Sequence, residues 1–190
     1  MTKRVVIFLL AALAVPVSGW GDVFLSLEGP ASPVTVGSSF WVNVNISGAV
    51  DLYAYQFDLT YPADMVQAIG AANGDFLPAA DLLLNQPLFD TSTAGLIQQV
   101  SNTLTGDAPG VNGAGWLASV QFQALAPGVA DIEPLNLFLL NSNLDLAPDV
   151  SGVGTDVTIT SGSGVVPEPG YGVLLALGVA ALVWRRLRTA

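Results

Sequence analysis

Apolar residues recur at every second position in a series of short runs between residues 23 and 160. Strict alternation of this kind is typical of β-strands with one buried face. In the clearest run, Phe40, Val42 and Val44 lie on one face, whereas Trp41 and Asn43 lie on the other. The runs that predict strands are 23–27, 34–36, 40–47, 52–61, 65–69, 96–100, 116–124, 135–140 and 155–160. The pattern predicts an all-β fold.

Aromatic residues are concentrated in the run 52–61. Tyr53, Tyr55, Phe57 and Tyr61 fall on one face of this strand, together with Leu59. So much aromatic surface must be covered or serve as a binding surface, and we expect it to form core.

Three segments lack a clear period. Residues 48–51 predict a turn between two strands, and residues 106–115 predict a flexible loop rich in Gly, Asn and Pro. Residues 78–90 contain two short leucine-rich pieces, which predict either a helical turn or a strand beneath a loop. In the run that follows, Trp116 shares a face with Ala118 and Val120.

Several of these runs together resemble a cohesin-type domain. The similarity lies in a Gly-bearing turn before a valine-rich strand, an aromatic strand, a Gly-Asp-Phe-Leu step and a Gly-initiated strand. These are residues 36–40, 57–61, 74–77 and 115–122. The resemblance implies a nine-stranded jelly-roll β-sandwich over residues 22–160, related to carbohydrate-binding modules. Cohesins bind calcium-loaded dockerin domains, but no residue of that contact set is identified in this chain.

The N-terminus carries a charged residue pair, Lys3 and Arg4, followed by an apolar run over 5–15 and then small residues. This order is typical of a secretory signal peptide. We expect residues 1–19 to be removed by signal peptidase after Gly19, with Gly21 as the alternative site.

The C-terminus carries a second targeting pattern. Residues 161–166 predict a flexible linker, and residues 171–184 predict a short apolar helix. Fourteen helical residues cover roughly 21 Å, which is less than a bilayer core of about 30 Å, so flanking residues would anchor at the interface. Arginines after the helix orient this end toward the cytoplasm. They are Arg185, Arg186 and Arg188.

The motif Pro167, Glu168 and Pro169, followed by this helix and the arginine cluster, resembles the PEP-CTERM sorting signal of Gram-negative bacteria. The resemblance covers the segment 167–190 and implies processing by an exosortase near the Pro-Glu-Pro motif. The expected route is an inner-membrane-anchored precursor and then the cell surface or the extracellular space. The alternative is an ordinary single-pass tail anchor.

Basic and acidic residues are distributed unevenly along the chain. The chain has 5 basic and 15 acidic residues and no histidine, and its basic residues all lie in the two targeting segments. A body without cations repels nucleic acid and anionic lipid, because binding either requires basic side chains to neutralise phosphate. Acidity of this kind attracts divalent cations or a basic partner, or it only keeps an exported protein soluble.

Cysteine is also absent, which excludes disulfides, thiol chemistry and Cys/His metal centres. Without His and Lys in the body, only carboxylates are left for catalysis. None of the candidate aspartates is singled out as a pair by spacing, so we expect a protein that is not an enzyme. The candidates are Asp58, Asp64, Asp75, Asp81, Asp90 and Asp107.

One oxygen-rich segment is a candidate calcium site. Its residues are Asn141, Asn143, Asp145 and Asp149. An EF-hand loop is excluded because Leu146 stands where glycine is needed and Gly152 stands where a carboxylate should be. An irregular calcium site and a self-satisfied Asn/Asp-rich hairpin both remain open.

Two functions fit these observations. The body is either a non-catalytic binding module for a polysaccharide or a protein, or a structural matrix component without a specific ligand. Exposure of Trp41 beside other aromatic rings would favour glycan binding, and burial of every ring would favour the structural role.

Overall fold

The computed structural model describes residues 22–162, and these residues form an all-β domain, which confirms the predicted fold class. The strands are β1 (Val23–Glu28), β2 (Val34–Thr35), β3 (Ser39–Thr60), β4 (Val66–Asn73), β5 (Leu88–Thr93), β6 (Leu96–Thr103), β7 (Val111–Ala124), β8 (Gly128–Asn141), β9 (Val150–Val153) and β10 (Thr155–Thr160). The signal peptide, the sorting motif and the helix 171–184 lie outside the described residues. Between residues 22 and 162, no helix has the length and apolarity needed to cross a bilayer.

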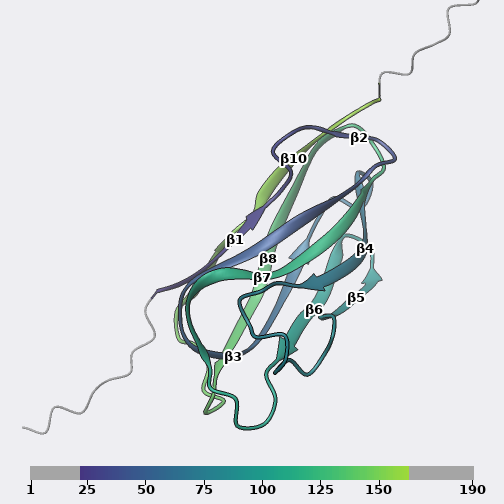
Figure 1. Cartoon of the computed structure of the whole chain (residues 1–190). Helices are drawn as coiled ribbons and strands as arrows, with labels where there is room; N and C mark the ends of the chain where they lie inside the picture. The colour runs from purple at the N-terminus through teal and green to yellow at the C-terminus, as the bar shows by residue number, and fades with distance from the viewer. Residues whose placement is uncertain (1–21, 163–190) are drawn as a thin grey trace, which may run out of the picture.

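The strands form two layers that share one strand, β3 (Figure 1). The first half of β3 pairs with β1 and β7. With β9 beside β1 and β4 beside β7, the first layer has the strand order β9-β1-β3-β7-β4. The second half of β3 pairs with β6 and β8, which gives the order β2-β10-β8-β3-β6-β5. Two sheets packed face to face with strands that switch between them make a β-sandwich.

The continuity of β3 corrects the prediction of two separate strands joined by a turn at 48–51. Here the chain bends without leaving the ladder, and the pairing with β7 shifts register between Ile46 and Leu52. Gly48 has φ of +71°, and a Cβ atom at this position would collide with the backbone oxygen of Asp22. Only glycine fits this bend, because a side chain would be strained and would clash.

The core lies between the two sheets. Phe57, Leu59 and Phe122 are fully buried there, as the alternation of the sequence predicts. The Tyr61 ring meets the Phe122 ring edge to face at 5.4 Å between centroids. The aromatic face of β3 therefore forms core, as expected, although Tyr53 is only partly buried.

Two irregular segments are now defined. Of the two alternatives for residues 78–90, the helical turn is not formed: residues 78–87 make turns and one bridge, Leu82 to Leu104, and the residues from Leu88 onward belong to the strand β5. The expected loop 106–115 becomes strand from Val111 onward, because this stretch pairs with the bent part of β3. The described domain has ten strands where the sequence predicted nine, because the expected runs 40–47 and 52–61 merge into β3 and the strands β5 and β9 were not among the expected runs.

Candidate functional site

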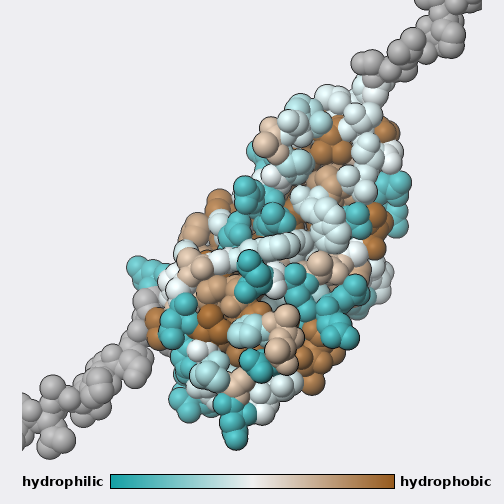
Figure 2. Space-filling model, viewed as in Figure 1, coloured by the Kyte–Doolittle hydropathy of each residue, from teal (hydrophilic) through white to brown (hydrophobic). Residues whose placement is uncertain are grey.

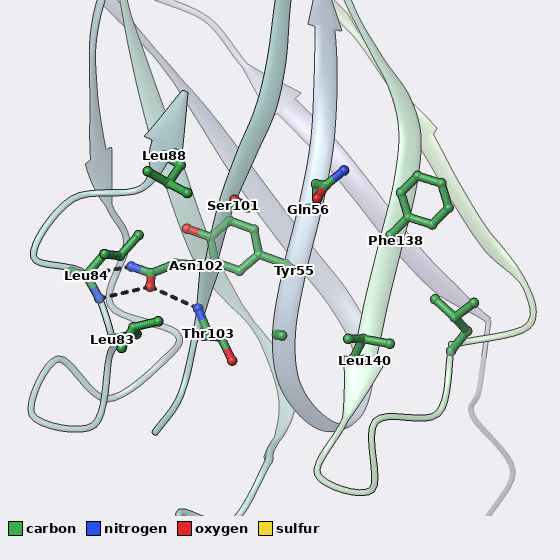
Figure 3. Close-up of a pocket in the computed structure, with 12 residues that line it drawn as sticks. Tyr55, Gln56, Leu83, Leu84, Leu88, Ser101, Asn102, Thr103, Phe138 and Leu140 are labelled. Atoms are coloured by element: carbon green, nitrogen blue, oxygen red, sulfur yellow. Dashed lines mark hydrogen bonds between the residues drawn. The ribbon is translucent and has the colours of Figure 1, made fainter. Parts of the chain in front are cut away.

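The second sheet carries a groove on its outer surface, which we call the leucine groove (Figure 3). Its floor is made by Ala54 and Gln56 of β3 with Ser101 and Thr103 of β6. Its rims are apolar and contain Leu83, Leu84 and Leu88 on one side and Phe138, Leu140 and Leu146 on the other. The volume of the groove is about 280 Å³.

The strand register explains this shape. Thr103, Ala54 and Leu140 lie opposite one another across three strands, and Ser101, Gln56 and Phe138 form the next row. Residues opposite one another in a ladder point to the same side of the sheet. Small and polar residues in the middle therefore lie lower than the large apolar residues at both edges.

Hydrogen bonds hold the leucine-bearing loop in place. The Leu83 amide donates to the Thr103 carbonyl at 2.8 Å, and the Leu84 amide donates to Oδ1 of Asn102 at 3.2 Å. Nδ2 of Asn102 donates in turn to the Leu84 carbonyl and to Oδ1 of Asn73, both at 2.9 Å. The rim is thus tied to β6 and to the end of β4.

Tyr55 lies beneath the floor of the groove, with its ring on the core side of β3, and its hydroxyl has no hydrogen-bond partner among residues 22–162. The residue is only 3% exposed, and its ring stacks on Phe57 at 5.9 Å. Burial raises the pKa of the Tyr55 hydroxyl, because the phenolate loses hydration. A buried hydroxyl without a partner lowers the stability of the folded domain.

The groove lies in an acidic setting. Asp81 and Asp90 lie two residues from Leu83 and Leu88, and Asp145 adjoins Leu146. No lysine, arginine or histidine occurs between residues 22 and 162. Leucines 83 and 88 and Phe138 are exposed, so the rims are apolar, and the charged residues next to them in the chain are acidic.

Asp58 has a structural environment. Its Oδ1 accepts from the Gln99 amide at 2.8 Å, and its Oδ2 accepts from Nδ2 of Asn136 at 2.7 Å. Gln99 and Asn136 both have positive φ, and the ladders of β3 with β6 and β8 shift register beside Asp58. The carboxylate therefore joins two β-bulges, one on each side of the central strand.

The candidate calcium residues are placed as follows. Oδ1 of Asn141 accepts from the amides of Asn143 and Asp145, at 2.9 and 2.8 Å, and Nδ2 of Asn141 donates to Oδ2 of Asp145 at 3.4 Å. The carbonyl of Asp149 accepts from Val23 at the start of β1. Among residues 22–162, no group of three or more Asp or Glu side chains could hold a metal. Calcium binding through Asn and backbone oxygens stays a prediction.

A second cluster lies on the outer surface of the other sheet. We call it the tryptophan platform: Trp41, Asn43, Ala72, Trp116 and Ser119, which line a hollow of about 300 Å³. Trp41 is 44% exposed and Trp116 is 38% exposed. Figure 2 shows apolar side chains in patches between hydrophilic ones on the face that it presents.

The sequence pattern missed the position of Trp116. Its spacing places it on the same face as Ala118, yet the ladder pairs Val44 with Ala118 and then Asn45 with Trp116. Leu117 is therefore the extra residue of a β-bulge. One extra residue reverses the alternation of side chains, so Trp116 points to the outer surface.

Comparison with solved structures shows a cohesin-like fold. A type II cohesin module from an adaptor scaffoldin of Acetivibrio cellulolyticus matches with a TM-score of 0.61 at 14% identity, over 80% of this chain and 98% of that chain. A cohesin of scaffoldin B from the same organism, solved with a Cel5 dockerin mutant, matches with a TM-score of 0.58 at 17% identity, over 74% and 100%. A non-cellulosomal cohesin from Archaeoglobus fulgidus matches with a TM-score of 0.56 at 15% identity, over 79% and 99%.

No protein-family model and no curated protein matches the chain. The likeness therefore concerns the fold, and it confirms the cohesin-type sandwich that the sequence motifs predicted.

Proposed function

We propose that the domain is an exported, non-catalytic binding module that holds a protein partner in the leucine groove. The observation that carries this proposal is the groove itself, in which exposed Leu83, Leu88 and Phe138 border a low floor. Apolar rims around a low floor resemble the buried centre of a protein interface, where aromatic and aliphatic anchors exclude water.

The surroundings define the chemistry of the partner. Asp81, Asp90 and Asp145 near the rims favour a partner segment that presents an apolar stripe flanked by lysine or arginine. Cohesins with the same fold have been solved in complex with dockerins, which supports a protein as the partner class.

Export is part of the proposal and is supported by the two targeting patterns of the sequence. In cells that lack the exosortase, we expect the chain to stay in the inner-membrane fraction and to keep its C-terminal tail. In cells that contain it, the shortened body should reach the surface or the medium. Recovery of the unprocessed chain from the cytosol would contradict this route.

To test the leucine groove, Leu88 is replaced by a photoreactive residue. The full chain carrying this residue is expressed in its native host. We expect one protein adduct, which is then identified and purified for binding measurements. Phe138→Asp should weaken its binding at least about tenfold, the loss typical of an interface anchor. The matched control is Val129→Asp, on the same strand but nine residues from the groove, where the side chain is 57% exposed.

The outcomes separate clearly. The same photoreactive residue placed at position 129 is the control for labelling, and equal adducts from positions 88 and 129 would indicate non-specific contact and contradict the proposal. The same holds if Phe138→Asp and Val129→Asp bind the purified partner with the same affinity as the unsubstituted chain.

A further inference from the structure

The outer surface of the first sheet carries two exposed indole rings separated by hydrogen-bonding groups. Trp41 belongs to β3 and Trp116 to β7, and the pair Asn43 and Ser119 lies in the row between them. We propose that this tryptophan platform binds a neutral polysaccharide, whose pyranose rings stack on the two indoles. The proposal concerns the opposite sheet from the leucine groove and does not depend on a protein partner.

Internal hydrogen bonds fix the Trp116 ring. Its Nε1 donates to the Ala118 carbonyl at 2.9 Å and to Oγ of Ser119 at 3.0 Å. The polar atom of the indole is therefore satisfied within the domain, and the exposed part of the ring is apolar. A ring that is already oriented loses little entropy when a sugar stacks on it.

The same chain of hydrogen bonds prepares Asn43. Oγ of Ser119 donates to Oδ1 of Asn43 at 3.0 Å, which fixes the orientation of the amide. Because Oδ1 of Asn43 already accepts this hydrogen bond, Asn43 can offer its Nδ2 group as a donor to a sugar hydroxyl. Both parts of a pyranose are thus matched: its C–H face by an indole and its hydroxyl edge by an amide.

The rest of this face is polar but almost uncharged. Its outward positions next to the platform are Ser26, Asn45, Ser47, Gln121 and Gln123, and exposed Phe24, opposite Ser47, is an apolar exception. The nearby carboxylate, Glu28, accepts a hydrogen bond from Asn45 at 3.3 Å. Amides and hydroxyls in rows match the hydroxyls of a glycan, whereas the buried centre of a protein interface is depleted of such groups.

Charge excludes two other ligands with flat rings or repeating units. Nucleic acid needs cations against its phosphates, and acidic polysaccharides need them against their carboxylates. Residues 22–162 contain no cation, and the formal charge of the whole chain is −10. The occupant is therefore an uncharged glycan.

The shape of the site indicates binding along a chain. Ala72 is a small residue opposite Ser119, and this leaves the hollow of about 300 Å³ between the indoles. This is at the lower end of small-molecule sites. Because the hollow lies on an open sheet surface, a polysaccharide can continue past both tryptophans.

Affinity electrophoresis tests the proposal with the mature protein released from cells that express the full chain. The native gels contain hydroxyethyl cellulose, galactomannan or dextran as neutral probes and alginate as the acidic control. We expect retardation by at least one neutral probe and none by alginate. Trp41→Ala should weaken the binding at least about tenfold, as for a tryptophan hot spot. Phe138→Ala, which removes an equally exposed aromatic ring from the other sheet, should leave the retardation unchanged.

Trp41 is the informative position because its substitution breaks none of the hydrogen bonds that hold Trp116. Addition of a bound probe should also change the tryptophan fluorescence of the unsubstituted protein. The proposal is overturned if no neutral probe retards it, or if Trp41→Ala is retarded equally. Sedimentation that shows a dimer lost in Trp41→Ala would assign the platform to a second copy of the chain instead.

Discussion

The two outer faces of the sandwich use the same strand for different purposes. In the second half of β3, the outward residues Ala54 and Gln56 are small or polar, so the large apolar groups lie on the neighbouring elements. In the first half, the large group Trp41 is on β3 itself, and polar residues follow it. The first arrangement makes a groove with apolar rims, and the second makes a polar surface with two stacking rings.

The comparison shows that the inward pattern of a sandwich specifies the fold, while its outward positions determine what each face can bind. Both halves of β3 bury the residues that face the core. Substitutions in the core should therefore affect both faces, and substitutions on one surface should affect that face alone. The predictions below follow this order, from the shared core to single surface groups.

The largest effect is expected for Phe57→Ala, which removes a fully buried ring between the sheets. A cavity of this size costs about 3–5 kcal/mol. Urea unfolding measures the loss, and both faces should lose binding together. Phe138→Ala is the matched control, because its ring is 47% exposed and its removal should change stability by less than about 0.5 kcal/mol. Similar values for the two variants would contradict the placement of Phe57 in the core.

A smaller effect is expected for Asp58→Ala. The change leaves the Gln99 amide and the Asn136 side chain without their acceptor. Both residues are exposed, so water replaces part of each bond, and the total loss of stability should be about 1–3 kcal/mol. Hydrogen exchange should increase around the two bulges, in β6 and β8, more than in β4 and β7. Asp64→Ala, at an exposed turn, is the control and should be nearly neutral. Equal exchange in all four strands would show that Asp58 does not act locally.

Tyr55→Phe should stabilise the unliganded domain by about 1 kcal/mol, because it removes the buried hydroxyl that lacks a partner. The midpoint of urea unfolding measures this gain. A loss of stability instead would indicate a hydrogen bond that the native domain makes to the Tyr55 hydroxyl.

Tyr55 also predicts a pH dependence. Its pKa in the folded domain is raised above the usual value of 10.0, so the unfolded chain ionises first as pH increases. The contribution of Tyr55 to stability is present below about pH 10 and is lost progressively at higher pH. Unfolding midpoints at pH 9 and pH 11 should differ less in Tyr55→Phe than in the unsubstituted protein. An equal difference in both would assign the alkaline loss to other groups.

The smallest effect is expected for Ser119→Ala on the other face. Trp116 keeps its hydrogen bond to the Ala118 carbonyl, so stability should fall by only about 1 kcal/mol. The orienting bond to Asn43 is lost, and the affinity for the neutral probe should decrease. Binding to a partner in the leucine groove should not change. If it does, the two faces are coupled.

The sequence was sufficient to predict the strands with a buried alternating face. The expected runs 23–27 and 155–160 match β1 and β10 closely, and the aromatic residues of 52–61 do form core. These elements were visible because burial of one face imposes a period of two. The cohesin-like motifs added the fold, since they order the turns and strands along the chain.

The leucine groove and the tryptophan platform were harder to predict from the sequence, because they depend on departures from the period of two. Trp116 reaches the surface through a bulge at Leu117, and a bulge leaves no mark in an alternating pattern. Most of β5 is exposed, so it shows no buried face and was not predicted as a strand of its own. The groove also depends on contacts between residues far apart in sequence, such as Gln56 with Phe138.

The shared strand has a consequence for how the chain acquires its structure. β3 ends at Thr60, but its partners β6, β7 and β8 are supplied by residues 96–141. The N-terminal half alone therefore leaves β3 without most of its ladder, and the long loops must close before these pairs stabilise it. Folding should begin only when the later half is available, so the chain can stay extended during its synthesis and during any passage through a narrow pore.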